Sequence, residues 1–129
     1  MILQNFVPFD FSEGVAYVSV TKNGITFNKA VMSKLNYPRY AVLLINKANA
    51  QIALQGHDHQ EPRSLPFYKG VDEKAVSVRW NGKDLLNTLS EIMGWDLTTS
   101  SYRIDGKLLP EERAILFDLQ EAKNLDSQQ

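Results

Sequence analysis

The sequence contains no cysteine, and this absence excludes several kinds of structure at once. Disulfide-stapled secreted domains, thiolate metal sites and cysteine nucleophiles all require that residue. The 129-residue chain is therefore held together without disulfides or thiolate-bound metal ions. Its content of 43% hydrophobic and 22% charged residues is ordinary for one globular unit, so we expect residues 1–129 to form a single domain.

Long apolar runs and a signal sequence are also missing. No stretch approaches the ~18 consecutive apolar residues that would span a bilayer. The opening residues, MILQNFVPFDF, lack the basic region and the small-residue cleavage site of a signal peptide. We therefore expect a cytoplasmic protein with no membrane contact.

Acidic residues are absent from the whole interval between Gly14 and His57. That interval carries five basic residues, which are Lys22, Lys29, Lys34, Arg39 and Lys47. The part after Asp96 is instead rich in acids, so the net charge of -1 hides an uneven distribution. We expect a positive region that faces an anionic partner, unless these charges are only solvated side chains that cluster by chance.

Catalytic signatures do not stand out. We find no Ser-His-Asp order, no phosphate-binding glycine loop and no paired catalytic carboxylates, so we expect a non-enzymatic protein without a cofactor. His57 and His59 would share one face of an extended segment, and with Asp58 or Glu61 they could hold a metal ion such as zinc. The alternative for this HDH stretch is a solvated loop.

The first half of the chain alternates strand-like and helix-like patterns. GVAYVSV predicts a strand, Asn23-Gly24 a turn and ITF a short second strand. Asn28 stands at the N-cap position of a helix, KAVMSKL, which Pro38 ends. The segments YAVLLIN and QIALQ, joined by KANA, predict a hairpin.

A similar order follows in the second half. KAVSVRW predicts a strand, Asn81-Gly82 a turn, and KDLLNTLSEIMG the strongest helix, with Gly94 at its end. The buried stripe of this helix is predicted to be Leu85, Leu89, Ile92 and Met93. TTSSYRI and AILFDL predict two strands on either side of a turn at Asp105-Gly106, and the polar residues that follow predict a frayed end.

A seven-residue motif occurs twice, as VSVTKNG from Val18 and as VSVRWNG from Val76. We interpret it as an internal duplication, while two unrelated halves with similar turns are the alternative. Two such units would pair across a pseudo-two-fold axis, because each leaves unpaired strand edges. The predicted fold is α+β: two tandem βαββ-like halves, at about 15–55 and 75–119 with a linker at 56–72, form one barrel or sheet with one main helix per half.

Residues 20–55, VTKNGITFNKAVMSKLNYPRYAVLLINKANAQIALQ, resemble the AbrB-type swapped-hairpin regulators, which are cradle-loop barrels. The matching letters are Gly24-Ile25, Asn28-Lys29, Leu35, the Tyr37-Pro38 break and the hairpin that ends at Ile52–Leu54. The resemblance implies DNA binding through basic residues at the hairpin and at the helix start. Those positions are Lys22 and Lys29, with Lys34 and Arg39 near them, and a dimer would double their number.

Aromatic residues are interleaved with basic ones in the stretches NYPRY and PFYK. This pattern is typical of surfaces on which the bases of a single-stranded nucleic acid stack, and it equally suits the core and rim of a small β-rich fold. We expect Trp80 and Trp95 to be core plugs at the ends of a barrel.

Two main functions are open from the sequence. The first is a small DNA-binding or regulatory module, with its contact surface for DNA or another polyanion at Lys22, Lys29, Lys34 and Arg39. The second is a protein-interaction or accessory factor of phage or mobile-element type, with no nucleic-acid role, whose acidic C-terminal half docks a basic protein partner. A metal-dependent enzyme at HDH is a third possibility.

Overall fold

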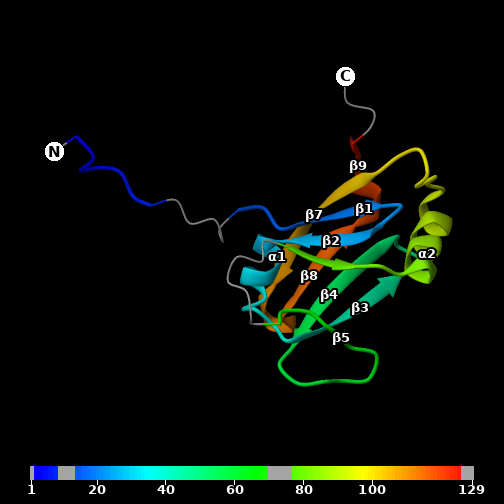
Figure 1. Ribbon diagram of the computed structural model, residues 1–129, viewed down its shortest axis with the longest axis horizontal. Helices are drawn as coiled ribbons and strands as arrows, with labels where there is room; N and C mark the ends of the chain where they lie inside the picture. Colours follow the sequence, from blue (N-terminus) through cyan, green and yellow to red (C-terminus); the bar gives the residue numbers. More distant parts are fainter. Residues whose placement is uncertain (1, 9–13, 70–76, 126–129) are drawn as a thin grey trace.

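The computed structural model describes residues 2–8, 14–69 and 77–125. Within them the chain forms one curled antiparallel sheet, a half-barrel, with a short helix near each end (Figure 1). The strands are β1 (Tyr17–Thr21), β2 (Gly24–Asn28), β3 (Tyr40–Asn46), β4 (Gln51–His57), β5 (Leu65–Pro66), β6 (Ser77–Trp80), β7 (Tyr102–Leu109), β8 (Ala114–Asp118) and β9 (Lys123–Asn124). The helices are α1 (Lys29–Lys34) and α2 (Lys83–Met93), and η2 (Pro110–Glu112) and η3 (Leu119–Glu121) are 3-10 turns.

The order of strands in the sheet is β5-β3-β4-β8-β7-β1-β2-β6, with β9 paired to β7. The hairpin β7-β8 therefore lies between the two N-terminal hairpins, β1-β2 and β3-β4. On one side β7 pairs with β1, where Ile104 stands opposite Val18. On the other side β8 pairs with β4, where Ile115 stands opposite Leu54.

The predicted α+β fold of two βαββ halves is wrong. The interval 15–55 does supply two hairpins and a helix, but the sheet separates these hairpins by inserting β7 and β8. α1 has only six residues, so the first half has no main helix. The physical reason is that β1 and β4 each have an inner edge to satisfy, and one hairpin from the second half satisfies both.

The repeated motif also has two different structures. Asn23-Gly24 leads from β1 into β2 in a tight hairpin, whereas Asn81-Gly82 leads from β6 directly into α2, with Gly82 as the N-cap. Gly24 has φ +144°, and a Cβ there would lie 2.5 Å from the carbonyl oxygen of Trp80. Gly24 is therefore required where the backbone of β6 passes close to β2.

The core fills the inside of the curl. Its fully buried side chains include Val18, Val20, Ile25, Phe27, Ile52, Leu54, Ile104, Ile115 and Phe117 from the strands. α1 adds Val31, Met32 and Leu35, which confirms the helical spacing predicted for them. Because burying one side chain of this size contributes ~1.5–3 kcal/mol, these positions supply most of the driving force for folding.

Aromatic rings lie where the two edge strands of the sheet, β5 and β6, approach each other. The indole Nε1 of Trp80 on β6 donates a hydrogen bond of 3.2 Å to the carbonyl oxygen of Pro66 on β5. The same ring packs edge-on against Phe27 and Phe67, at 5.3 and 5.8 Å between centroids. Trp80 thus lies at the seam of the half-barrel, while Trp95 stacks on Tyr102 at 4.1 Å beside α2.

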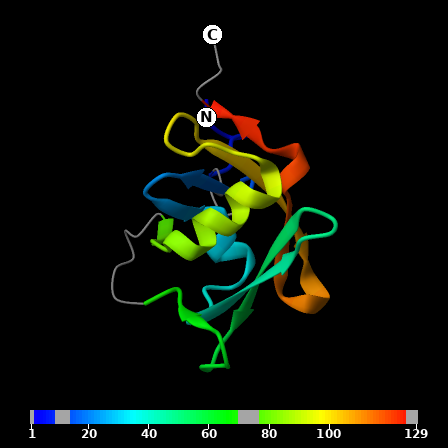
Figure 2. The same ribbon diagram turned by 90° about the vertical axis from the view of Figure 1, so that its right-hand side faces the viewer.

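The helices lie at opposite ends of the curled sheet (Figure 1). The side chain of Asn28 accepts a hydrogen bond from the N–H of Val31, which confirms it as the N-cap of α1. α2 lies across the other end (Figure 2) and buries Leu86 and Leu89, while Leu85, Ile92 and Met93 are only half-buried. In the part of the chain that the structure describes, no helix is long and apolar enough to cross a membrane.

Three local predictions differ from the structure. Asp105-Gly106 is not a turn but lies inside β7. The glycine is needed there because the side chains of Ile115 and Phe117 on β8 come close to the strand: a Cβ at Gly106 would lie 2.7 Å from Phe117 Cε1. The predicted frayed end contains η3 and β9. The predicted linker 56–72 begins with the last residues of β4 and contains β5, and its residues 70–72 lie outside the described residues.

Candidate functional site

Polar side chains cover the outward face of the strands β7, β1, β2 and β6. Alternate residues of these strands point into the core, so the residues between them point outward. The register places Arg103, Ser19, Thr26 and Arg79 in one row across the four strands. Lys123 on β9 extends the row beyond Arg103. We call these five residues the basic row.

A hollow of about 800 Å³ opens beside the basic row. Its lining includes Ser19, Thr26 and Arg103 of the row, together with Tyr17, Asn28, Lys29 and Ser77. Arg79 reaches the same face, since its Nε donates to the hydroxyl of Thr26 at 3.4 Å. Guanidinium, ammonium and hydroxyl groups are donors that anions prefer, and arginine can bind a phosphate through two parallel hydrogen bonds.

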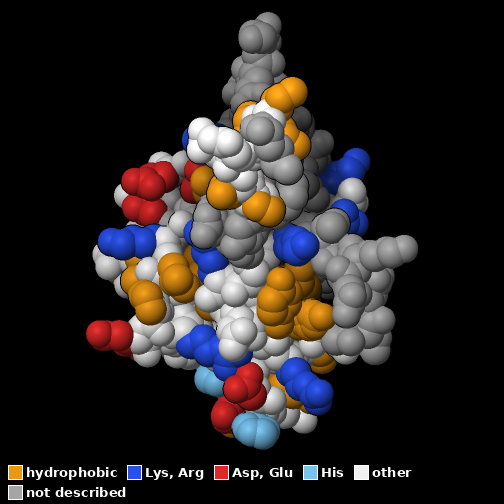
Figure 3. Space-filling model, turned by 90° about the vertical axis from the view of Figure 1, so that its left-hand side faces the viewer, with side chains coloured by type: hydrophobic (Ala, Val, Ile, Leu, Met, Phe, Trp, Pro, Cys, Tyr) orange, Lys and Arg blue, Asp and Glu red, His pale blue; other side chains and the backbone are white. Residues whose placement is uncertain are grey.

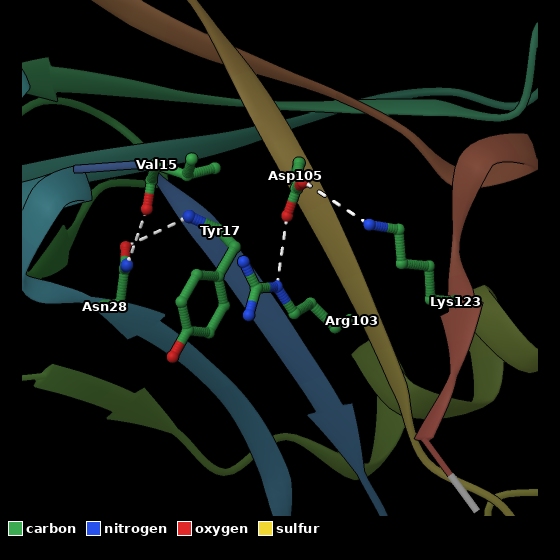
Figure 4. Close-up of polar contacts among 6 residues, drawn as sticks. All are labelled: Val15, Tyr17, Asn28, Arg103, Asp105 and Lys123. Carbon is green, nitrogen blue, oxygen red and sulfur yellow. Dashed lines mark hydrogen bonds and ion pairs between the residues drawn. The ribbon is translucent and has the colours of Figure 1, made fainter. Parts of the chain in front are cut away.

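Asn28 fixes the edge of this hollow where β2 becomes α1. Its Oδ1 accepts from the N–H of Tyr17 at 3.0 Å, and its Nδ2 donates to the carbonyl oxygen of Val15 at 2.9 Å (Figure 4). The same Oδ1 also accepts from the N–H of Val31 at 3.3 Å. One side chain therefore holds β1, β2 and the start of α1 in fixed positions. Lys29, the next residue, lines the hollow as a consequence.

Asp105 orders the opposite end of the row. Its carboxylate accepts from the Nε of Arg103 at 3.1 Å, and the Nζ of Lys123 lies 3.9 Å away (Figure 4). The guanidinium of Arg103 lies over the ring of Tyr17, 3.8 Å from its centroid. This cation–π contact and the ion pair hold Arg103 along the sheet, and they leave its side chain 35% exposed.

The four basic residues predicted to bind nucleic acid do not form one cluster. Lys29 lines the hollow and Lys34 ends α1, so both lie near one end of the sheet, and exposed Arg39 lies between α1 and β3. Lys22 is in the β1-β2 turn at the other end, beside Lys83 of α2. On the side of the molecule seen in Figure 3, Lys and Arg side chains are spread among apolar ones, and Asp and Glu gather at its left margin and lower end.

The HDH stretch does not assemble a metal site in the structure. His57 stands in β4 opposite Tyr40, and His59 is exposed in the loop that follows. Asp58 accepts a hydrogen bond of 2.8 Å from Arg113. Within residues 2–8, 14–69 and 77–125, no three His, Asp or Glu side chains converge so that they could hold a metal ion.

Arg79, Arg103 and Lys123 were missed by the sequence reasoning. The outward positions of Arg79 and Arg103 follow from the alternation in SVRW and SYRI, whereas no local pattern marks Lys123. The neighbours were not readable, because Arg103 meets Ser19 only after a hairpin from the far end of the chain pairs with β1. Comparison of the chain with protein-family models, with curated proteins and with solved structures found no match.

Proposed function

We propose that this protein is a non-enzymatic module that binds the phosphates of a nucleic acid along the basic row. The observation that carries the proposal is the placement of Arg103, Ser19, Thr26 and Arg79 on four successive strands of one open face. Arginine and hydroxyl donors suit phosphate oxygens, which arginine can bind through two parallel hydrogen bonds.

The shape of the face favours a polymer over a small anion. Arg79 and Arg103 are three strand spacings apart, about 14 Å at the usual separation of ~4.8 Å between neighbouring strands. A face that spans four strands can take successive phosphates of one nucleic-acid strand, with the guanidinium of Arg103 over Tyr17 and that of Arg79 beside Thr26. Lys29 borders the same hollow and offers a further cation.

The number of cations sets the expected strength of binding. Few basic side chains lie on this face, and Asp105 partly neutralises two of them. We therefore expect affinity in the range of weak, sequence-independent binding, with Kd of about 10⁻⁴–10⁻⁶ M at physiological salt, and a strong dependence on salt concentration.

The test is fluorescence anisotropy of labelled DNA over a salt series. Arg79→Gln, Arg103→Gln and Lys29→Gln should each weaken binding, and each should lower the slope of log K against log salt by about 1. Lys47→Gln is the matched control, because Lys47 is exposed at the tip of the β3-β4 hairpin, away from the row. Lys22→Gln should also leave binding unchanged.

Removal of the acid provides the converse test. Asp105→Asn should tighten binding at low salt, because it takes a negative charge from the row, while Glu91→Gln on α2 removes the same charge elsewhere and should have little effect. The proposal is wrong if no nucleic acid binds at low salt, or if Lys47→Gln weakens binding as much as Arg79→Gln.

A second candidate is a protein-interaction factor. The observation that favours it is the N-terminal stretch 2–8, in which Ile2, Leu3, Phe6 and Val7 are all largely exposed. Clustered exposed apolar side chains are typical of contact surfaces between proteins. A partner bound in this way should stay bound as salt is raised and should be lost from the double variant Leu3→Ser, Phe6→Ser, whereas binding through the basic row shows the opposite pattern.

A further inference from the structure

The two stretches in which aromatic and basic residues alternate come together in the structure. The N–H of Phe67 donates to the carbonyl oxygen of Arg39 at 2.8 Å, and the N–H of Tyr68 donates to that of Pro38 at 3.0 Å. NYPRY and PFYK therefore run side by side at the start of β3. Tyr37 and Tyr68 meet edge-to-face with ring centroids 5.0 Å apart. We call Tyr37, Arg39, Tyr40, Tyr68 and Lys69 the tyrosine corner.

The backbone under the tyrosine corner is strained. Asn36 and Tyr37 both have left-handed backbones, with φ +59° and φ +49°. Asparagine tolerates this region, but a bulky residue such as tyrosine is rarely found there. The N–H groups of Asn36 and Tyr37 donate to the carbonyl oxygens of Ser33 and Met32, which ends α1, and the side chain of Tyr37 remains 42% exposed. The turn that ends α1 therefore presents the ring of Tyr37 at the surface.

Arg113 holds the strained turn in place. Its Nε donates to the carbonyl oxygen of Leu35 at 2.9 Å, and another guanidinium nitrogen donates to that of Asn36 at 3.3 Å. A third contact, to Asp58 at 2.8 Å, anchors the guanidinium itself. Pro38 packs against Gly56, where an added Cβ would lie 2.9 Å from the proline ring. The corner is thus preorganised rather than an adaptable loop.

A small hollow opens at the corner, and Tyr37 lies next to it through its ring contact with Tyr68. Arg39, Tyr40, Pro66, Tyr68 and Lys69 line a space of about 260 Å³, which is below the ~300–1,000 Å³ of typical sites for whole small molecules. Tyrosine faces and cations side by side are the combination that stacks a base and binds its phosphate. We propose that the tyrosine corner stacks a base of a single-stranded nucleic acid.

This inference rests on the proposed function, because it identifies which form of nucleic acid the protein binds. α1 connects the two regions: Lys29, at its first residue, borders the hollow beside the basic row, and Lys34, at its last residue, is three positions before Tyr37. A single strand can lay its phosphates along the row and turn one base into the corner. A duplex keeps its bases stacked inside, so it has no free base that could stack in the tyrosine corner.

The experiment compares two probes with equal numbers of phosphates. One is a labelled dT oligomer of about 15 nucleotides, within the ~4–16 nucleotides of small single-strand sites, and the other is an abasic oligomer of the same length. The wild-type protein should bind the dT oligomer about 5- to 150-fold more tightly, which is the effect of one stacked base. An rU oligomer should share this advantage, and a duplex of equal length should not.

The variants separate stacking from phosphate contact. Tyr37→Ala and Tyr68→Ala should make the affinities for the dT and the abasic oligomer nearly equal. Tyr37→Phe keeps the ring and should preserve the tighter binding of the dT oligomer. Arg79→Gln on the basic row should weaken both probes by the same factor. Thermal unfolding of each variant checks that the fold is intact.

Each outcome has a separate meaning. If the wild type binds the dT and abasic oligomers equally, stacking at the corner is refuted and the proposed phosphate-binding function stands. The same holds if the duplex binds more tightly than the single strand. If neither oligomer binds at low salt, the proposed function and this inference both fail.

Discussion

Asp96 is a single exposed residue whose chemistry depends on its neighbours in the turn after α2. Its carboxylate accepts from the hydroxyl of Thr98 at 2.5 Å and from the N–H of Thr98 at 3.0 Å. The hydroxyl contributes most, and together the two donors lower the pKa of Asp96 below its ordinary value. They favour the charged form, so the native turn binds a proton less readily than the unfolded chain does.

Thr98→Val should move the pKa of Asp96 back toward its ordinary value. A carboxyl group with a lowered native pKa contributes stability above its unfolded pKa of ~3.9, and that contribution disappears as the pH falls through the native value. The wild type should therefore melt at a higher temperature than Thr98→Val near neutral pH, and the gap should narrow in acid. Carboxyl ¹³C NMR titration and melting curves measure the two effects.

Thr99→Val is the matched control for this prediction. The hydroxyl of Thr99 donates to the main-chain carbonyl of Asp96 and not to its carboxylate. Removal of this hydroxyl should leave the pKa of Asp96, measured by NMR titration, unchanged. An equal shift in both variants would contradict the assignment of the pKa shift to the hydroxyl of Thr98.

Single residues differed in how well the sequence predicted them. Asn28 was predicted as an N-cap from its place before an apolar, helix-period run, and the cap depends only on the next three residues. For Gly106, the local pattern predicts a turn residue beside Asp105. A glycine is required at this position because the side chains of Ile115 and Phe117 lie too close for a Cβ, and no local pattern can reveal such a close approach.

At the scale of elements, Arg113 connects three segments that are far apart in the chain. It joins the end of α1 to the loop after β4 from its own position between η2 and β8. Arg113→Lys keeps a positive charge for Asp58 but loses the planar fork that reaches two carbonyl oxygens. We expect a loss of ~1–3 kcal/mol in the free energy of unfolding, measured by urea denaturation at unchanged m-value.

Arg63→Lys is the control for this element. Arg63 also has a left-handed backbone, with φ +65°, but it lies exposed in the loop between β4 and β5. An exposed substitution of this kind should change stability by less than ~0.5 kcal/mol. Equal midpoints of urea denaturation for Arg113→Lys and Arg63→Lys would show that Arg113 does not stabilise the turn at the end of α1.

Elements with a strong local signal were predicted well, and elements that exist only through pairing were not. The helix at Lys83–Met93 and the hairpin of β3 and β4 follow from hydrophobic period and turn residues. β9 has two polar residues and no signal of its own; it is a strand because Tyr102 and Arg103 lie beside it. The basic row escaped prediction for the same reason, since register is a property of pairs of strands.

At the scale of the whole molecule, the strand order makes the two parts of the chain dependent on each other. A fragment of residues 1–69 should not fold alone, because β1 and β4 lose their partners β7 and β8. Circular dichroism should detect no cooperative thermal transition for this fragment or for residues 70–129. Mixing the two at equal concentration should restore the transition.

Independent folding of either fragment would contradict this expectation. A cooperative transition of residues 1–69 near the melting temperature of the full chain would mean that β1-β2 and β3-β4 can pair without the inserted hairpin. The global arrangement could not be predicted because edges of strands do not record their partners in the sequence.

The inserted hairpin has a consequence for how the protein is made in the cell. β1 to β4 leave the ribosome first, and the strands that join them follow roughly 60 residues after β4, about 3–12 s later at ~5–20 residues per second. During that interval the nascent chain exposes two strand edges and the apolar residues of an open curl. The growing polypeptide is therefore prone to edge-to-edge association with other chains until β8 emerges.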